Sequence, residues 1–198
     1  MNVDQLIPNK PKQKRSLDRY ELILDAVEEI LIHEGVHSVN IQKVSIVANM
    51  KRPTLYKLFP SNESLFHGLS ERHIENFSKL FIKNSESSLI KKPEWYFNLF
   101  IDLISIYLNQ NKASASLFFY LESFPKSKST NLQNKRLLAS LILQVMSEKE
   151  IDISAEKVYI ASQLCLSTLS ISFGEENHIS PRYVIESKKA VNAYLVTA

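Results

Sequence analysis

Apolar residues recur along most of this chain at intervals of three and four positions, a spacing that places them on one face of an α-helix. The patterned stretches are about 15 to 20 residues long, a length typical of helices rather than strands. The clearest apolar face near the start of the chain consists of Tyr20, Ile23, Leu24, Val27, Ile30 and Leu31. Glu21, Glu28 and Glu29 lie on the opposite side of the same predicted helix. The pattern predicts an all-α protein.

Three helices are expected in the first third of the chain. The first ends at Gly35, which tolerates the positive φ of a helix C-terminus. Asn40 is placed to cap a short second helix with its side-chain oxygen. Asn49 is expected to make a tight turn, because asparagine tolerates positive φ better than most residues. A third short helix then begins near Arg52 and ends at Pro60.

A long fourth helix is predicted from residue 61 or 62, with either Ser61 or Asn62 as its cap. The later helices are expected at about residues 93–109, 113–124, 132–147, 155–173 and 181–196. The composition of residues 1–17 predicts a flexible basic arm. We therefore divide the chain into this arm, a first helical domain at residues 18–64, and a second, larger helical domain at residues 65–198.

The positive charge is concentrated in the first third, although the formal net charge is only +3. Between residues 35 and 62 the charged side chains are Lys43, Lys51, Arg52 and Lys57, without an acidic one. The single Cys165, the absence of a secretory signal pattern and the absence of a long apolar run predict a cytoplasmic protein without a membrane segment.

Two short helices joined by a sharp turn form the geometry in which the second helix enters a DNA major groove. The residues around this turn resemble the TetR family of bacterial regulators. The resemblance covers about residues 18–66 and rests on Gly35, Asn40-Ile41, Val44, Ala48, Arg52-Pro53-Thr54-Leu55-Tyr56-Lys57-Leu58-Phe59 and Ser61-Asn62-Glu63-Ser64-Leu65. Asn49, Lys51 and Asn62 depart from the family pattern, which has a turn glycine, a capping Ser or Thr, and a lysine at these positions.

The resemblance implies that Asn40, Tyr56 and Lys57 contact DNA phosphates, which fixes the register without reading sequence. Base reading then falls to the start of the third helix, where Arg52 can grip a guanine edge. The complete expected DNA-binding set is Asn40, Lys51, Arg52, Pro53, Thr54, Tyr56 and Lys57.

The resemblance further implies a repressor that a small-molecule effector releases from double-stranded operator DNA. Residues 18–64 would be its DNA-binding domain, and residues 65–198 its ligand-binding and dimerisation domain. Large apolar side chains in the later helices are mostly core, and the candidates for effector contact are Phe77, Leu103, Tyr107, Phe119, Tyr120, Leu138 and Ile142. The last two helices are expected to form a homodimer, and the small side chains Ala161, Cys165, Thr168 and Ser172 provide a face suited to helix pairing.

Two other classes of function stay open at this point. His33-Glu34-Gly35-Val36-His37 matches the H-E-x-x-H motif of zinc metallo-hydrolases, in which His33 and His37 bind the metal and Glu34 is the general base. Gly35 would end the helix within that motif, which argues against it. A helical interaction protein that binds no DNA is the second alternative. Our interpretation is a regulator that is not an enzyme and needs neither metal nor cofactor.

Overall fold

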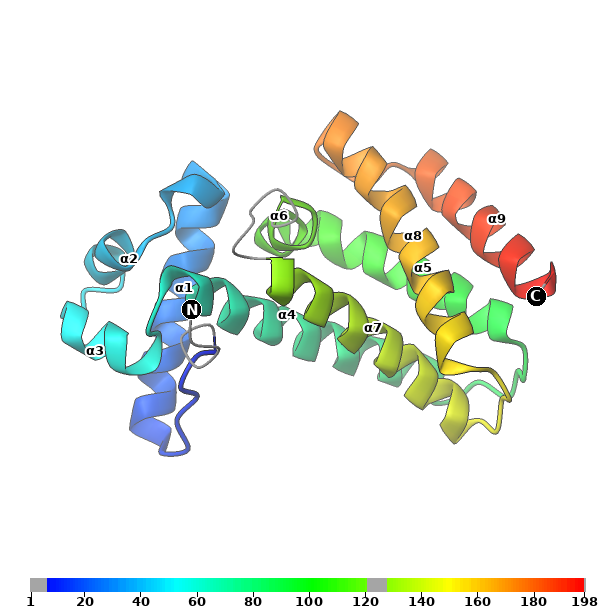
Figure 1. The fold of residues 1–198 in the computed structure, drawn as a ribbon, viewed down its shortest axis with the longest axis horizontal. Helices are drawn as coiled ribbons and strands as arrows, with labels where there is room; N and C mark the ends of the chain where they lie inside the picture. Colours follow the sequence, from blue (N-terminus) through cyan, green and yellow to red (C-terminus); the bar gives the residue numbers. More distant parts are fainter. Residues whose placement is uncertain (1–6, 121–127, 198) are drawn as a thin grey trace. The chain divides into compact units, whose positions relative to one another are not determined.

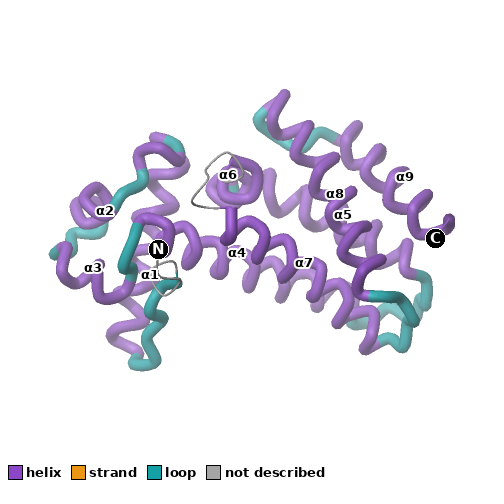
Figure 2. The backbone as a smooth tube through the Cα atoms, viewed as in Figure 1, coloured by secondary structure: helices purple, strands orange, loops and turns teal. Residues whose placement is uncertain are grey.

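A computed structural model describes residues 7–120 and 128–197. These residues form helices and loops, and no strand occurs among them (Figures 1 and 2). The helices are α1 (Lys14–Glu34), the 3-10 helix η2 (Val36–Ser38), α2 (Ile41–Val47), α3 (Arg52–Leu58), α4 (Asn62–Ser85), α5 (Pro93–Gln110), α6 (Lys112–Tyr120), α7 (Lys128–Glu148), α8 (Ala155–Glu176) and α9 (Pro181–Thr197). The predicted all-α fold is confirmed.

The first helix begins earlier than the sequence pattern predicts. It starts at Lys14, inside the stretch assigned to the arm, because Leu17 extends the apolar face of Tyr20 and Leu24 by one turn and is itself half-buried. Its end is as predicted. Gly35 follows the helix with φ +80° and donates its main-chain N–H to the carbonyl of Leu31 at 3.2 Å.

The chain forms two compact units that do not follow its order strictly. Unit 1 contains the residues up to His73 and the segment that begins at Lys112, whereas unit 2 contains Ile74–Asn111 and the residues from Asn131 onward. Helix α4 continues from unit 1 into unit 2. Helix α6 falls in unit 1, since its apolar residues Ala113 and Leu117 join the same core as α1. The sequence grouped α6 with the later helices instead.

The core of unit 1 places α1 and the start of α4 very close together. Tyr20 of α1 stacks on Phe59 with ring centroids 4.6 Å apart. Gly68 of α4 faces this pair, and a Cβ atom there would lie 2.7 Å from the Tyr20 hydroxyl oxygen. Burial and the nearby Glu71 raise the pKa of Tyr20. Because Gly68 has no side chain, α1 and α4 pack more closely there than any other residue would allow.

Charged groups on the same two helices hold them in register. Arg72 of α4 lies 2.6 Å from Asp25 and 2.5 Å from Glu28 of α1, measured between guanidinium nitrogen and carboxylate oxygen. Burial and this guanidinium lower the pKa of the adjacent His73 to about 4. The imidazole is therefore neutral near pH 7, and its Nε2 atom lies 3.5 Å from Glu28 as an uncharged ring.

Unit 2 is built around α5, α8 and α9. Helices α8 and α9 lie side by side (Figure 1), and the buried face of α5 includes Phe97, Phe100 and Ile104. Lys188 of α9 donates to Asp102 of α5 at 2.7 Å, which joins these helices at their edge. None of the helices in residues 7–120 and 128–197 has the length and apolar character needed to cross a bilayer.

Candidate nucleic-acid interface

Two asparagines each accept a hydrogen bond from one of the free main-chain donors at the start of α2. The side-chain oxygen of Asn40 accepts from the N–H of Lys43 at 2.9 Å, so the predicted cap is confirmed. The side-chain oxygen of Asn62, at the start of α4, accepts from the N–H of Ile41 at 3.0 Å. The N-terminus of α2 is thus fixed both by its own cap and by a residue 21 positions later.

The turn between α2 and α3 has the expected left-handed residue. Asn49 adopts φ +49°, and it is one of three non-glycine residues with positive φ in the described part of the chain. Its N–H donates to the carbonyl of Ile46 at 3.1 Å, and the N–H of Met50 donates to Ser45 at 2.9 Å. These bonds reverse the chain within a few residues, so α3 follows α2 as a separate short helix (Figure 1).

Helix α3 buries one side and exposes the other. Leu55 lies within the helix and Phe59 directly follows it, and both are fully buried in the core of unit 1. Tyr56 is 53% exposed, so its ring is not part of the core. The side chain of Lys51 precedes the helix and forms no capping hydrogen bond with it, as its substitution for Ser or Thr predicts.

The structure brings the predicted DNA-binding residues onto these two short helices and the turn between them. The exposed members are Lys51, Arg52, Pro53, Tyr56 and Lys57, and the half-buried ones are Asn40 and Thr54. Lys43, the other cation of this region, is paired with Glu34. An exposed surface with cations and hydrogen-bond donors but without acidic groups can neutralise phosphates and donate to base edges.

Sequence reasoning missed two residues that support this surface. Asn62 was identified as a possible cap of α4, yet its side chain caps α2 instead. The start of α4 is closed by Ser61 and Ser64, which exchange hydrogen bonds of 3.1 Å between each hydroxyl and the other residue's N–H. Asn9 donates to the end of α3 from outside any helix. The sequence carries no local signal for contacts over such separations.

The zinc-binding alternative is not favoured by the geometry of its own residues. His33 lies in the last turn of α1, whereas His37 lies in η2 beyond the bend at Gly35, so no single helix carries both. Glu34, the required general base, is paired with Lys43. Within residues 7–120 and 128–197 no group of His, Cys, Asp and Glu is arranged to hold a metal ion.

The predicted effector-binding residues fall in both units. In unit 2, Phe77 contacts Phe100 edge-on with ring centroids 5.4 Å apart and Tyr107 with centroids 5.6 Å apart. Leu138 and Ile142 of α7 are fully buried, and Leu103 is half-buried. Phe119 belongs to α6 in unit 1, and the side chain of Tyr120 lies outside the described residues.

The small-residue face of α8 is buried inside this chain. Ala161, Cys165 and Ser172 are fully buried. Burial raises the pKa of the Cys165 thiol to about 12, and the Ser187 hydroxyl of α9 lies beside it. This face pairs α8 with α9 of the same chain and is not available to a second copy. The close helix packing that these small residues favour is therefore made within the chain, and the homodimer stays a prediction.

A different face of α8 is apolar and exposed. Ile160, Leu164 and Ile171 are 37%, 36% and 51% exposed. Their spacing of four and seven positions places them on one side of the helix, where they span about 16 Å at 1.5 Å per residue. On α9, Ile185 and Val196 are also exposed.

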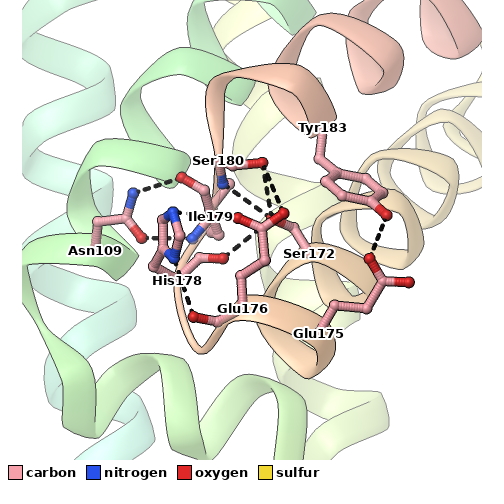
Figure 3. Close-up of polar contacts among 8 residues, drawn as sticks. All are labelled: Asn109, Ser172, Glu175, Glu176, His178, Ile179, Ser180 and Tyr183. Atoms are coloured by element: carbon pink, nitrogen blue, oxygen red, sulfur yellow. Dashed lines mark hydrogen bonds and ion pairs between the residues drawn. The ribbon is translucent and has the colours of Figure 1, made fainter.

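The turn that joins α8 to α9 is held by hydrogen bonds from α5 and α8 (Figure 3). The amide of Asn109 donates to the carbonyl of Ile179 at 2.8 Å and accepts from its N–H at 2.7 Å. The hydroxyl of Ser172 accepts from the N–H of Ser180 at 2.9 Å. Asn177 supplies the left-handed residue, with φ +55°. The two helices are consequently fixed as a pair.

Comparison with known proteins identifies the region that carries this surface. Residues 23–69 match the family model described as bacterial regulatory proteins, tetR family. No curated protein matches the chain.

Solved structures with a similar fold include a TetR-family transcriptional regulator from Streptomyces coelicolor, with a TM-score of 0.72 and 15% identity over 92% of this chain and 98% of that one. The fatty acid degradation regulator FadR from Bacillus halodurans gives a TM-score of 0.66 and 13% identity over 95% and 98% of the two chains. The multidrug binding protein EbrR, complexed with imidazole, gives a TM-score of 0.65 and 12% identity over 89% and 94%. Identities this low show the shared fold alone.

Proposed function

We propose that this chain is a dimeric repressor which a small molecule releases from its operator. The premise is the match of residues 23–69 to the TetR family of bacterial regulatory proteins, which supports a DNA-binding transcriptional regulator. The observation that carries the proposal is the exposed, acid-free surface of α2 and α3. It presents Lys51, Arg52, Tyr56 and Lys57 on one short helix and the residue before it. Helix α3 is the recognition helix of this proposal.

Each residue of the surface has its own proposed role. Tyr56 and Lys57 bind phosphates and set the register, and Arg52 reads a base. Asn40 uses one amide hydrogen to donate to Ser38 at 3.2 Å, so its second hydrogen is free to donate to a phosphate. Thr54 and Lys51 are proposed as further base contacts, and Pro53 offers only apolar surface.

Two substitutions distinguish the residue proposed to contact phosphate from the residue proposed to read a base. Tyr56→Ala is expected to weaken binding to every duplex, because a phosphate contact carries no sequence information. Arg52→Ala is expected to relax the preference at one base position, at a cost of about 1–3 kcal/mol on the preferred site. Lys83→Ala in unit 2 removes an exposed cation and serves as the matched control. Affinity of Tyr56→Ala equal to that of the unchanged protein would count against this register.

The proposed dimer forms through the exposed apolar face of α8, extended by α9. Apolar side chains that lie in a row at the surface favour association with a second copy, since burying them removes that area from water. The hydrogen-bonded turn at Asn109 supports this, because a fixed helix pair loses little conformational freedom when it associates. A two-fold dimer would present two copies of α3 one DNA turn apart.

A charge placed in the proposed interface tests the dimer. Leu164→Glu with Ile171→Glu is expected to give a monomer in sedimentation equilibrium, because two carboxylates would be buried unpaired against the second copy. Ile106→Glu is the matched control, since Ile106 of α5 is 52% exposed and lies outside this face. Equal molecular mass for both variants, either dimer or monomer, would exclude this interface.

The effector is proposed to bind in unit 2 near the aromatic cluster of Phe77, Phe100 and Tyr107. Phe77 and Phe100 are buried, and Tyr107 is half-buried and carries a phenol. A site opened among these side chains would suit an apolar or amphipathic molecule. Release of DNA requires that the effector bind one of two conformations more tightly, and α4, which continues through both units, is the proposed connection.

Trp95, the single tryptophan of the chain, reports on unit 2. Titration with a panel of apolar and amphipathic compounds should identify one that shifts Trp95 emission and also lowers affinity for DNA. Tyr107→Phe is expected to lower the affinity for that compound. The affinity of the variant for DNA in the absence of the compound should stay unchanged. A saturating compound that leaves DNA affinity unaltered is not the effector.

A further inference from the structure

The segment that precedes α1 is attached to the recognition helix. The main-chain N–H of Asn9 donates to the carbonyl of Leu58 at 2.7 Å, and its side-chain Nδ2 donates to the carbonyl of Lys57 at 2.9 Å. Pro8 is buried. Residues 8 and 9 are therefore a fixed part of unit 1, and not the beginning of a flexible arm.

The two bonds reach carbonyl groups that the recognition helix itself leaves without partners. The last carbonyls of an α-helix have no donor within the helix, and Lys57 and Leu58 are the last two residues of α3. Asn9 therefore caps α3 from 48 positions away in the sequence. By closing this end, it fixes α3 and the segment around Asn9 relative to each other.

The residues that follow Asn9 carry a concentration of positive charge. Lys12, Lys14 and Arg15 are exposed, and no acidic residue lies in the first turn of α1. Cations at a helix N-terminus are unfavourable, because the helix dipole is positive there. A bound anion would relieve this repulsion. The charges lie outside residues 23–69, the part that the family model matches.

We propose that residues 10–15 are a second DNA-binding element, which contacts the phosphate backbone of the duplex that α3 reads and which Asn9 positions. The proposal rests on the DNA binding assigned to α3 above. Asn9 is a positioning residue in it, since it acts through Lys12 and its neighbours and touches no phosphate itself.

The reach of the segment fits this role. Lys12 lies three positions after Asn9, so its main chain lies within about 11 Å of Asn9, the residue that is hydrogen-bonded to the end of α3. Duplex DNA carries one phosphate charge per about 1.7 Å of its axis, so about six charges fall within that distance. This is also close to the screening length of about 10 Å at 0.1 M salt. A cation held there acts on the same stretch of backbone as Lys57.

The salt dependence of DNA binding measures the number of phosphate contacts and tests the proposal. We would measure the affinity of the full chain for a fluorescein-labelled 30-base-pair duplex of mixed sequence between 50 and 200 mM KCl. Lys10→Gln with Lys12→Gln and Lys14→Gln is expected to reduce the slope of log K against log salt by about 2 to 3. Lys83→Gln with Lys92→Gln and Lys112→Gln removes the same charge elsewhere and is expected to leave the slope unchanged.

Asn9→Ala removes the side-chain bond, and Asn9→Pro removes both bonds because proline has no N–H. Either variant should lower the slope, and removal of the three lysines should then cost less affinity than it does in the unchanged protein. Thermal unfolding by circular dichroism separates this effect from loss of fold.

The outcomes distinguish this inference from the proposed function. Binding by the unchanged protein, with the lysine variant matching it in affinity and slope, would overturn the second element and leave DNA reading by α3 intact. A lower slope for the lysine variant and an unaltered slope for both Asn9 variants would overturn the positioning role of Asn9. Failure of the unchanged protein to bind any duplex at 50 mM KCl would overturn both proposals.

Discussion

Replacement of Gly68 by alanine is expected to lower the free energy of unfolding, although alanine is the better helix former. A Cβ atom at this position would lie 2.7 Å from the hydroxyl oxygen of Tyr20, 2.9 Å from Cε1 of Phe59 and 3.3 Å from Cδ2 of Leu24. Tyr20 and Phe59 are both buried and stacked on each other, so neither ring can move without disturbing the core of unit 1.

The magnitude follows from two opposing contributions. Overpacking a well-filled core costs about 1–3 kcal/mol, and exchanging glycine for alanine inside a helix returns about 0.5–1 kcal/mol. The net loss lies between about 0 and 2.5 kcal/mol, and each kcal/mol lowers the melting temperature by roughly 2–4 °C for a chain of this length. Urea denaturation followed by circular dichroism provides the free energy, and a thermal scan provides the second measure.

Gly174→Ala is the matched control, because Gly174 lies within α8 and a Cβ atom there has no neighbour within 4 Å. This variant should be more stable by about 0.5–1 kcal/mol. Tyr20→Phe, which removes the oxygen that makes the closest contact, should partly restore the Gly68→Ala variant. If Gly68→Ala is as stable as Gly174→Ala, the close packing of α4 on α1 that we describe is incorrect.

Three further predictions concern acid, the α8–α9 turn and the start of α2. Burial and Arg72 lower the pKa of His73 to about 4 from an ordinary 6.5, so between these pH values the unfolded chain binds a proton that the folded chain does not. The free energy of unfolding should fall by up to about 3 kcal/mol as the pH drops from 6.5 to 4, and a His73→Gln variant should show a flatter profile in urea titrations. Asn109→Ala removes both hydrogen bonds between the Asn109 side-chain amide and the main chain of Ile179, and it should reduce both the melting temperature and dimer formation in sedimentation equilibrium. A variant that keeps both would contradict the role of the turn. Asn62→Ala leaves the N–H of Ile41 without its acceptor and should cost about 1 kcal/mol in urea denaturation, whereas no measurable cost would mean that water replaces the amide.

The parts of the fold that could be predicted depend on local chemistry. The cap at Asn40 and the turn at Asn49 follow from what an asparagine side chain and backbone can do within a few residues, and both are confirmed. The helices follow from the three-and-four spacing of apolar positions. Helix α1 begins before its predicted start because a single half-buried residue, Leu17, extends that spacing.

The parts that could not be predicted depend on residues far apart in the chain. Asn9 and Asn62 have ordinary sequence surroundings, and only the folded chain places them against α3 and α2. The small residues of α8 are suited to close helix packing, but the sequence does not say whether the partner helix belongs to the same chain. In the structure it does, since Ser187 of α9 lies beside Cys165. The contacts of Tyr56 and Arg52 with DNA stay a prediction.

The most direct test of the central claim, that α2 and α3 form a sequence-reading DNA surface, is selection of bound fragments from sheared genomic DNA by the purified full chain, followed by sequencing. We expect a small set of enriched fragments that share a near-palindromic motif with half-sites about one helical turn apart, and no enrichment of that motif by the Arg52→Ala variant with Tyr56→Ala. Recovery of fragments without any shared motif, or equal enrichment by the variant, would contradict the account.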